Sequence, residues 1–308
     1  PGAKSAGRVQ SVALKLICER ENDRESFEKK EYWSISSNLT WKDQTLKSQL
    51  SEYKGNKLKK FDISNEGEAN NIVLDIQGTK LNVAEINKKP QKRNPKPPFI
   101  TSTLQQEAAR KLKFSADNTM RIAQSLYEKA LITYMRTDSP IIDPEGIHSI
   151  REIIVEKYGN NFLPQDQKIY KSKSKQVQEA HEAIRPTDVF KLPKDSALEV
   201  NEKNLYELIW NRAVSSQMES AKLTQTEVLI TSDTKEAVFK STGTQIIFKG
   251  FLEVYEEGVD NQEEEKESFI PSEIKEGDDL ILESISPEQH FTKPPPRFTE
   301  ASLIKELE

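Results

Sequence analysis

The chain has 308 residues, of which 35% are hydrophobic and 31% are charged, so it is long enough for two or three domains and too apolar for the disordered class. No apolar run is long enough to span a membrane, and the first residues lack the pattern of a signal peptide. We therefore expect a soluble, cytoplasmic protein. Its single cysteine, Cys18, excludes an internal disulfide and a cysteine-based zinc site, and we expect it to be a small core residue.

Charge is unevenly distributed along the chain. The net charge is −5, which taken alone argues against a nucleic-acid partner. Residues 91–140, however, contain nine lysines and arginines against four acidic residues, whereas residues 251–280 contain two against twelve. Because the acidity is segregated, a basic surface that faces DNA is compatible with this composition.

The first third of the chain combines one helix with a group of strands. Apolar residues recur at helical spacing in residues 7–25, with Ser5 as a cap. Short β-type runs follow at residues 32–41, 58–63 and 81–86. The Pro- and Lys-rich segment 88–98 disfavours helix, and we place a domain boundary there.

A helical block comes next, and further strands follow it. Ser102 and Gln105 form a capping-box pattern, and residues 143–145 (DPE) are typical of a helix start with proline in the first position. Helices are predicted at residues 118–129, 147–158 and 204–218. Strands are predicted at residues 226–231, 237–241, 244–249 and 280–284. We therefore predict one discontinuous β domain that carries the helical unit at its tip.

The sharpest local feature is the segment 131–139, LITYMRTDS. If it is extended, alternation places Tyr134, Arg136 and Asp138 on one side, with Ile132 a candidate for the same side. A phenol beside a guanidinium suits phosphoryl transfer, because the attacking oxygen must lose its proton and the charge on the phosphate needs a fixed cation. On the residues alone, the competing interpretation is that Tyr134 is a packed strand residue.

A second group of polar residues lies in the segment 179–187, EAHEAIRPT. His181 and Arg185 are four residues apart and would share one face of a helix that Pro186 ends. Both side chains can contact a phosphate, but a structural histidine and a surface arginine explain the same residues.

A third candidate is the segment 5–10, SAGRVQ, which forms a small-residue turn into the first predicted helix. Free N–H groups and the dipole at a helix start favour phosphate binding. Arg8 and Gln10 add side-chain donors. The alternative is a capped helix with an exposed arginine.

Together these motifs resemble bacterial type IA DNA topoisomerases. Residues 132–139 are similar to the active-site signature of that family, and the segments 5–11, 98–106, 179–187 and 295–303 are similar to other family motifs in the same order. The resemblance implies that Tyr134 is the catalytic nucleophile, that Arg136 is the cation at the phosphate, and that His181 orients the reacting groups or stabilises charge. The DNA-binding residues that it implies are Ser5, Ala6, Gly7, Arg8, Val9, Gln10, Arg185 and Arg297.

The resemblance also implies the fold, a multidomain α and β chain that forms part of the family's toroid. In it a β-rich arch carries an inserted helical tyrosine domain and is joined to parts of a helical gate domain. Thr101 or Ser102 would border the active site or cap a helix. The implied divisions are gate domain 1–30, arch 31–95, tyrosine domain 96–220, second part of the arch 221–285 and second part of the gate domain 286–308.

The implied activity is ATP-independent relaxation of negatively supercoiled DNA. A single-stranded stretch is cleaved through a 5′-phosphotyrosine intermediate, the other strand passes, and the break is resealed. The family's Toprim domain holds Mg²⁺ with an Asp-x-Asp-x-Glu cluster, which these residues lack. We therefore expect a piece of a longer, monomeric, nucleoid-associated bacterial enzyme, inactive by itself and without metal ligands of its own.

Other functions fit the same residues. The chain could be a non-catalytic module that binds single-stranded DNA, or a decatenase similar to topoisomerase III, although the segments around Tyr134 and Arg297 favour the topoisomerase I branch. Tyrosine recombinases also join a tyrosine to DNA with help from arginine and histidine. Their linkage is to the 3′ phosphate, so the polarity of a covalent adduct separates the two enzyme classes.

Overall fold

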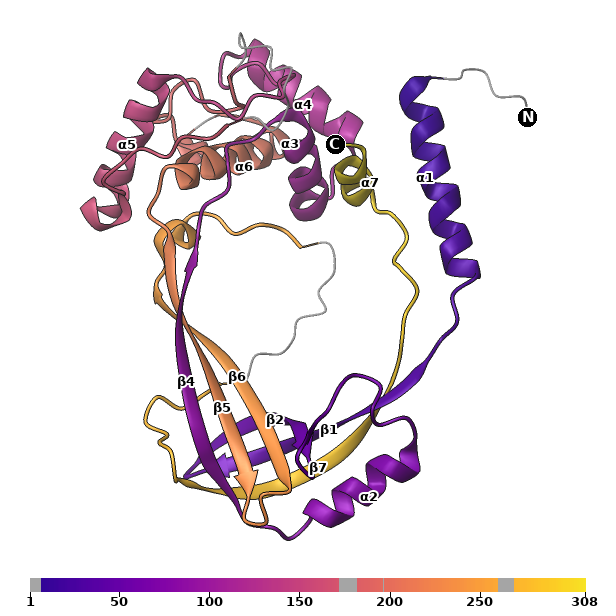
Figure 1. The fold of residues 1–308 in the computed structure, drawn as a ribbon. Helices are drawn as coiled ribbons and strands as arrows, with labels where there is room; N and C mark the ends of the chain where they lie inside the picture. The colour runs from indigo at the N-terminus through magenta and orange to yellow at the C-terminus, as the bar shows by residue number, and fades with distance from the viewer. Residues whose placement is uncertain (1–6, 172–181, 196, 260–268) are drawn as a thin grey trace.

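A sheet and a helical block lie at opposite ends of the molecule (Figure 1). The computed structural model describes residues 7–171, 182–195, 197–259 and 269–308. The segment after the last strand returns to the helical block on the other side, so the parts form a ring (Figure 1). This mixture of helices and antiparallel sheet confirms the predicted α and β composition. The long strands that connect the two ends are β4 (Leu81–Arg93), β5 (Ala221–Ser232) and β6 (Ala237–Phe248).

The described strands form one sheet whose edges meet. The order is β1-β7-β4-β5-β6-β2-β3, and β1 also pairs with β2, which closes the sheet into a barrel. Every second residue from Ile35 to Trp41 is buried, so one face of β1 packs on the core. Helix α2 (Glu66–Ile76) adds Ile72 and Ile76 to that core. The remaining strands are β1 (Glu31–Trp41), β2 (Gln44–Tyr53), β3 (Asn56–Lys57) and β7 (Asp279–Phe291).

The strand predicted at residues 58–63 is wrong, because this segment forms a turn. The Asp62 carboxylate accepts a hydrogen bond from the Lys59 N–H at 2.8 Å, which closes the turn locally. Ile63 is still buried in the core of the sheet. The apolar residues that favoured a strand therefore mark contact with the core.

The domain boundary predicted within residues 88–98 falls inside a strand for half its length. Strand β4 continues to Arg93 and stays paired with β5 through the pairing of Arg93 with Ala221. Pro90 is compatible with this strand because, among the described strands, β7 pairs with β4 at Leu81 and Asn82 and none pairs with Pro90 on that side. The two runs predicted at 237–241 and 244–249 likewise merge into β6.

The helical block has two adjoining apolar cores. Its α-helices are α3 (Thr101–Glu107), α4 (Ala116–Glu128), α5 (Pro144–Tyr158) and α6 (Val200–Ser216), with a short π-helix, η1 (Ala108–Leu112), and short 3₁₀ helices η2 (Asn160–Phe162), η3 (Pro193–Asp195) and η4 (Gly250–Glu253). The three predicted helices are confirmed, and Asp143 caps α5 by accepting the Glu145 N–H at 2.8 Å. The capping box expected from Ser102 and Gln105 is wrong: the Ile100 N–H donates to the Thr103 hydroxyl instead.

Helix α1 (Arg8–Glu25) confirms the first predicted helix, but it does not join a core. Its Gly7 N–H donates to the Gln10 side chain, and the predicted cap Ser5 lies outside the described residues. Cys18 is exposed, so its prediction as a core residue is wrong. The reason is that α1 contacts the segment 295–298 and does not pack into a core. Arg20, for example, donates a hydrogen bond to the Pro296 carbonyl at 2.7 Å. Helix α7 (Glu300–Leu307) packs on α3.

None of the helices in the described part of the chain is both long and apolar enough to cross a lipid bilayer.

Two buried tyrosines predict alkaline destabilisation of the helical block. Burial raises the pKa of Tyr206 to about 12 and raises the pKa of Tyr255 further. Above pH 10 these phenols ionise in the unfolded chain and stay protonated in the folded chain. We therefore expect the free energy of unfolding to fall by roughly 1 kcal/mol per tyrosine per pH unit. Urea titrations at pH 8, 10 and 11 measure this slope, and Tyr206→Phe should make it shallower; an unchanged slope contradicts the prediction.

Candidate active site

Three segments that are far apart in the sequence meet around Tyr134. Ile184 forms an isolated bridge with Phe99, and Pro186 forms one with Ile132. The Thr133 N–H donates to the Arg185 carbonyl at 2.9 Å. The family-like segments 98–106 and 132–139 and the described residues 182–187 of the third are therefore brought together by backbone contacts, although the segment 132–139 is an irregular loop. We call residues 131–139 the tyrosine loop.

Burial alternates along the tyrosine loop as an extended segment predicts. Tyr134, Arg136 and Asp138 are exposed, whereas the residues between them, Met135 and Thr137, are buried. Tyr134 is 39% exposed, so part of this residue lies at the surface of the helical block. Ile132 was a candidate for the same side, but it is 1% exposed because it packs into the core of the helical block.

Arg136 is available to an anion. Within the part of the chain that the structure describes, its guanidinium has no hydrogen-bond or ion-pair partner. It follows Tyr134 by two residues on the exposed side of the loop. A phosphate held there would gain charge-assisted hydrogen bonds without displacing a carboxylate.

Thr101, the first residue of α3, holds the backbone on both sides of Arg136. Its hydroxyl lies 2.8 Å from the Met135 carbonyl and accepts the Thr137 N–H at 2.8 Å. Its own N–H donates to the Thr137 carbonyl at 2.9 Å. The start of α3 therefore fixes the direction in which Arg136 leaves the loop.

Replacing Thr101 by valine keeps the shape of the side chain but leaves a buried N–H and carbonyl without this partner. We expect the free energy of unfolding to fall by about 1–3 kcal/mol and any reaction at Tyr134 to slow. Urea denaturation and adduct formation measure the two effects. Thr101→Ser keeps the hydroxyl and is the control; equal losses in both variants would show that the hydroxyl is not what holds the loop.

The second predicted group is only partly described. His181 lies outside the described residues, and residues 182–187 are extended, so the helix predicted to carry His181 and Arg185 on one face is wrong there. The backbone of Ile184 is taken up by the pairing with Phe99, which competes with a helix. The Arg185 guanidinium pairs with Glu182 at 2.9 Å, so a DNA phosphate at Arg185 would have to compete with that carboxylate.

The third predicted group lies apart from the tyrosine loop, on α1 and the segment beside it (Figure 1). Ser5, Ala6 and the side chain of Arg8 lie outside the described part of the chain. Gly7 and Gln10 bond to each other, and Val9 is exposed. Arg297 makes two hydrogen bonds to the Glu21 carboxylate, at 2.8 and 2.9 Å, while its side chain stays 72% exposed.

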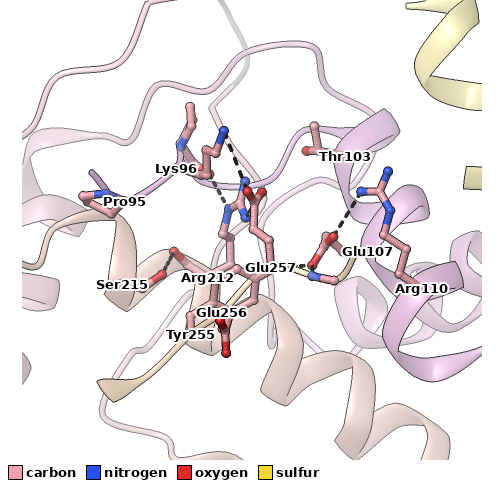
Figure 2. A network of polar contacts seen from close by, with 12 residues as sticks. Pro95, Lys96, Thr103, Glu107, Arg110, Arg212, Ser215, Tyr255, Glu256 and Glu257 are labelled. Carbon is pink, nitrogen blue, oxygen red and sulfur yellow. Dashed lines mark hydrogen bonds and ion pairs between the residues drawn. The ribbon is translucent and has the colours of Figure 1, made fainter. Parts of the chain in front are cut away.

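The far end of α3 is held by buried charges (Figure 2). The Glu107 carboxylate is 2% exposed and accepts the Tyr255 hydroxyl at 2.5 Å and the Gly258 N–H at 3.1 Å. Beside it, Arg212 pairs with Glu257 at 3.0 Å. Helix α3 is therefore fixed at its start to the tyrosine loop and at its end to the segment that follows β6.

Two neighbours of Tyr134 carry no sequence signal that marks them. The Thr133 hydroxyl donates to the Ala183 carbonyl at 2.7 Å and accepts the Arg185 N–H at 2.9 Å. The ring of Tyr127 contacts the ring of Tyr134. Spacing along the chain could have indicated only that Tyr127 ends a helix shortly before the loop.

A metal site is not formed by the described residues: no three histidine, cysteine, aspartate or glutamate side chains among them are placed to hold one ion. These residues therefore do not fit the Mg²⁺ cluster that the type IA resemblance implies.

Comparison with known proteins gives consistent matches over the whole chain. The sequence model of a family described as DNA topoisomerase matches residues 1–308. The DNA topoisomerase 1 of Rickettsia bellii (strain RML369-C) is 47% identical over 319 residues, which cover 100% of this chain and 40% of that protein. The DNA topoisomerase 1 of Zymomonas mobilis (strain ATCC 31821) is 45% identical, covering 100% of this chain and 26% of that protein.

A solved structure agrees with these matches. The full-length topoisomerase I from Thermotoga maritima superposes with a TM-score of 0.79 at 34% sequence identity. The superposition covers 99% of this chain and 48% of that one. The chain thus spans less than half the length of these relatives.

Proposed function

Because the chain belongs to the DNA topoisomerase family, we propose that it carries the nucleophile of a type IA enzyme that relaxes negatively supercoiled DNA. The phenol oxygen of Tyr134 attacks a backbone phosphate of single-stranded DNA and loses its proton. The bond to the 3′ oxygen breaks, leaving a 3′ hydroxyl and a 5′-phosphotyrosine. After strand passage the 3′ hydroxyl attacks the phosphotyrosine and regenerates the phenol. No ATP is consumed, since the phosphotyrosine conserves the bond energy.

The observation that carries this proposal is that the tyrosine loop has exposed side chains on a backbone that is held by hydrogen bonds. Tyr134 and Arg136 leave the same side of a loop whose backbone is hydrogen-bonded to Thr101 and to the segment 183–187. An ordered loop holds the nucleophile and the cation at fixed positions relative to one phosphate. Positioning of this kind supplies much of the rate enhancement in phosphoryl transfer.

Each predicted site residue has a role in this reaction. Arg136 stabilises the charge that develops on the phosphate, and we expect His181 to orient the phosphate or stabilise its charge. Ser5, Ala6, Gly7, Arg8, Val9, Gln10, Arg185 and Arg297 are proposed contacts to the DNA backbone. Mg²⁺ would supply neutralisation of phosphate charge, and we expect a Toprim domain to hold it.

Incubation with a 5′- or 3′-labelled single-stranded oligonucleotide tests the proposal, with a Toprim domain added in trans. We expect a covalent adduct that retains the DNA on the 3′ side of the break, linked through its 5′ phosphate. Salt-sensitive binding without any adduct would instead indicate a binding module, and linkage to a 3′ phosphate would indicate recombinase chemistry. Decatenation in preference to relaxation would place the chain with topoisomerase III.

A further inference from the structure

Tyr127 and Tyr134 form an aromatic pair at the surface. Their ring centroids are 5.4 Å apart and the rings are inclined by 67°, an edge-on contact. The two residues are 41% and 39% exposed, so both are accessible to solvent while they touch each other. Exposed aromatic rings that contact a candidate nucleophile are well placed to control its orientation.

The backbone of Tyr127 is fixed independently of the tyrosine loop's tip. Tyr127 lies in the last turn of α4, where the Ala130 N–H donates to the Tyr127 carbonyl at 2.8 Å and the Leu131 N–H donates to the Leu126 carbonyl at 2.9 Å. Two residues further on, the Lys129 ammonium pairs with Glu202 at 2.5 Å. The ring of Tyr127 therefore projects from a well-supported helix end.

The ring of Tyr134 leaves the loop between residues whose backbone is held by hydrogen bonds. The hydrogen bonds that hold the loop are made by Thr133 on one side and by Met135 and Thr137 on the other. A tyrosine side chain has more than one staggered rotamer, and contacts with neighbouring side chains decide which one is populated. The contact with Tyr127 favours the rotamer in which the two rings meet.

We propose that Tyr127 is a positioning residue for the nucleophile: its ring holds the ring of Tyr134 in the orientation from which the phenol oxygen attacks DNA. The proposal rests on the function proposed above for Tyr134. An aromatic pair of this kind changes the population of a rotamer by about two- to tenfold, so the cleavage rate should change by a similar factor. Affinity for DNA should not change.

The experiment uses Tyr127→Ala, Tyr127→Phe and a matched control, Phe61→Ala, in this chain with a Toprim domain in trans. Phe61 is suitable because it makes the same kind of edge contact with Tyr32, at 5.7 Å and 77°, in the sheet. Single-turnover adduct formation at saturating oligonucleotide gives the rate, and fluorescence anisotropy gives the affinity. NMR of tyrosine-labelled chain reports the rotamer of Tyr134 without any DNA.

Tyr127→Ala should lower the rate two- to tenfold, leave the affinity within about twofold and broaden the Tyr134 rotamer distribution, while Tyr127→Phe and Phe61→Ala match the parent chain. A loss of affinity with an unchanged saturated rate would overturn the proposal and make Tyr127 a stacking platform for bases. An unchanged rate in Tyr127→Ala overturns it directly. If the parent chain forms no adduct, the proposed function itself fails, whatever the NMR shows.

Discussion

Tyr134→Phe is expected to abolish the covalent adduct with single-stranded DNA while leaving the fold unchanged. The substitution removes only the phenol oxygen, which is the attacking atom. Because the residue is 39% exposed, we expect the free energy of unfolding to change by no more than about 0.5 kcal/mol. The rate of adduct formation should fall by at least about a thousandfold, since removal of a nucleophile eliminates the covalent route.

Tyr127→Phe is the matched control for this experiment. It removes the same oxygen from the neighbouring ring, whose centroid lies 5.4 Å from that of Tyr134. Adduct formation should persist in this variant and the linkage should remain at the 5′ phosphate. Adduct formation by Tyr134→Phe would refute the assignment of the nucleophile, whereas loss in both variants would point to a requirement for the pair of hydroxyls.

The sequence predicted the parts of the site that depend on local pattern. Alternation along the tyrosine loop was sufficient to place Tyr134 and Arg136 on the same side, and the structure shows that this side is exposed. The proline and aspartate at the start of α5 were sufficient to predict that helix. In both cases the determining interactions are made within a few residues along the chain, so a single sequence contains them.

What the sequence could not predict depends on distant contacts. Ile132 fits the alternation but is drawn into the core of the helical block. Pro90 argues against a strand, yet it pairs with β5 on one side and meets no described strand on the other. Cys18 was predicted to be a core residue, but it is exposed because its helix contacts the segment around Pro296 and does not pack into a core. Each outcome depends on which element lies opposite, and spacing along one chain does not contain that information.

Glu107→Ala is expected to be the most destabilising single substitution considered for the helical block. The buried carboxylate accepts hydrogen bonds from Tyr255 and Gly258 and pairs with Arg110 at 3.2 Å (Figure 2). Alanine leaves a phenol, a backbone N–H and a cation without this partner. Breaking a buried charged pair from one side costs about 3–5 kcal/mol, so the urea midpoint should fall markedly with an unchanged m-value.

Two further variants separate the charge from the packing. Glu107→Gln keeps the size and one acceptor, and we expect a smaller loss, of about 1–2 kcal/mol. Glu156→Ala, at an exposed position on α5, is the control and should change stability by less than about 0.5 kcal/mol. Equal losses in the alanine and glutamine variants would indicate that the negative charge is the whole contribution of this residue.

The same substitution should also affect the chemistry, because α3 links the two ends of the network. Glu107 is the last residue of α3, and Thr101, the first, holds the backbone around Arg136. Combining Glu107→Ala with Tyr255→Phe removes the orphaned hydroxyl, so we expect about 1 kcal/mol of stability to return. If adduct formation recovers in step with stability, the buried carboxylate acts on Tyr134 through the order of α3. Recovery of stability without recovery of the rate would separate the two and limit Glu107 to folding.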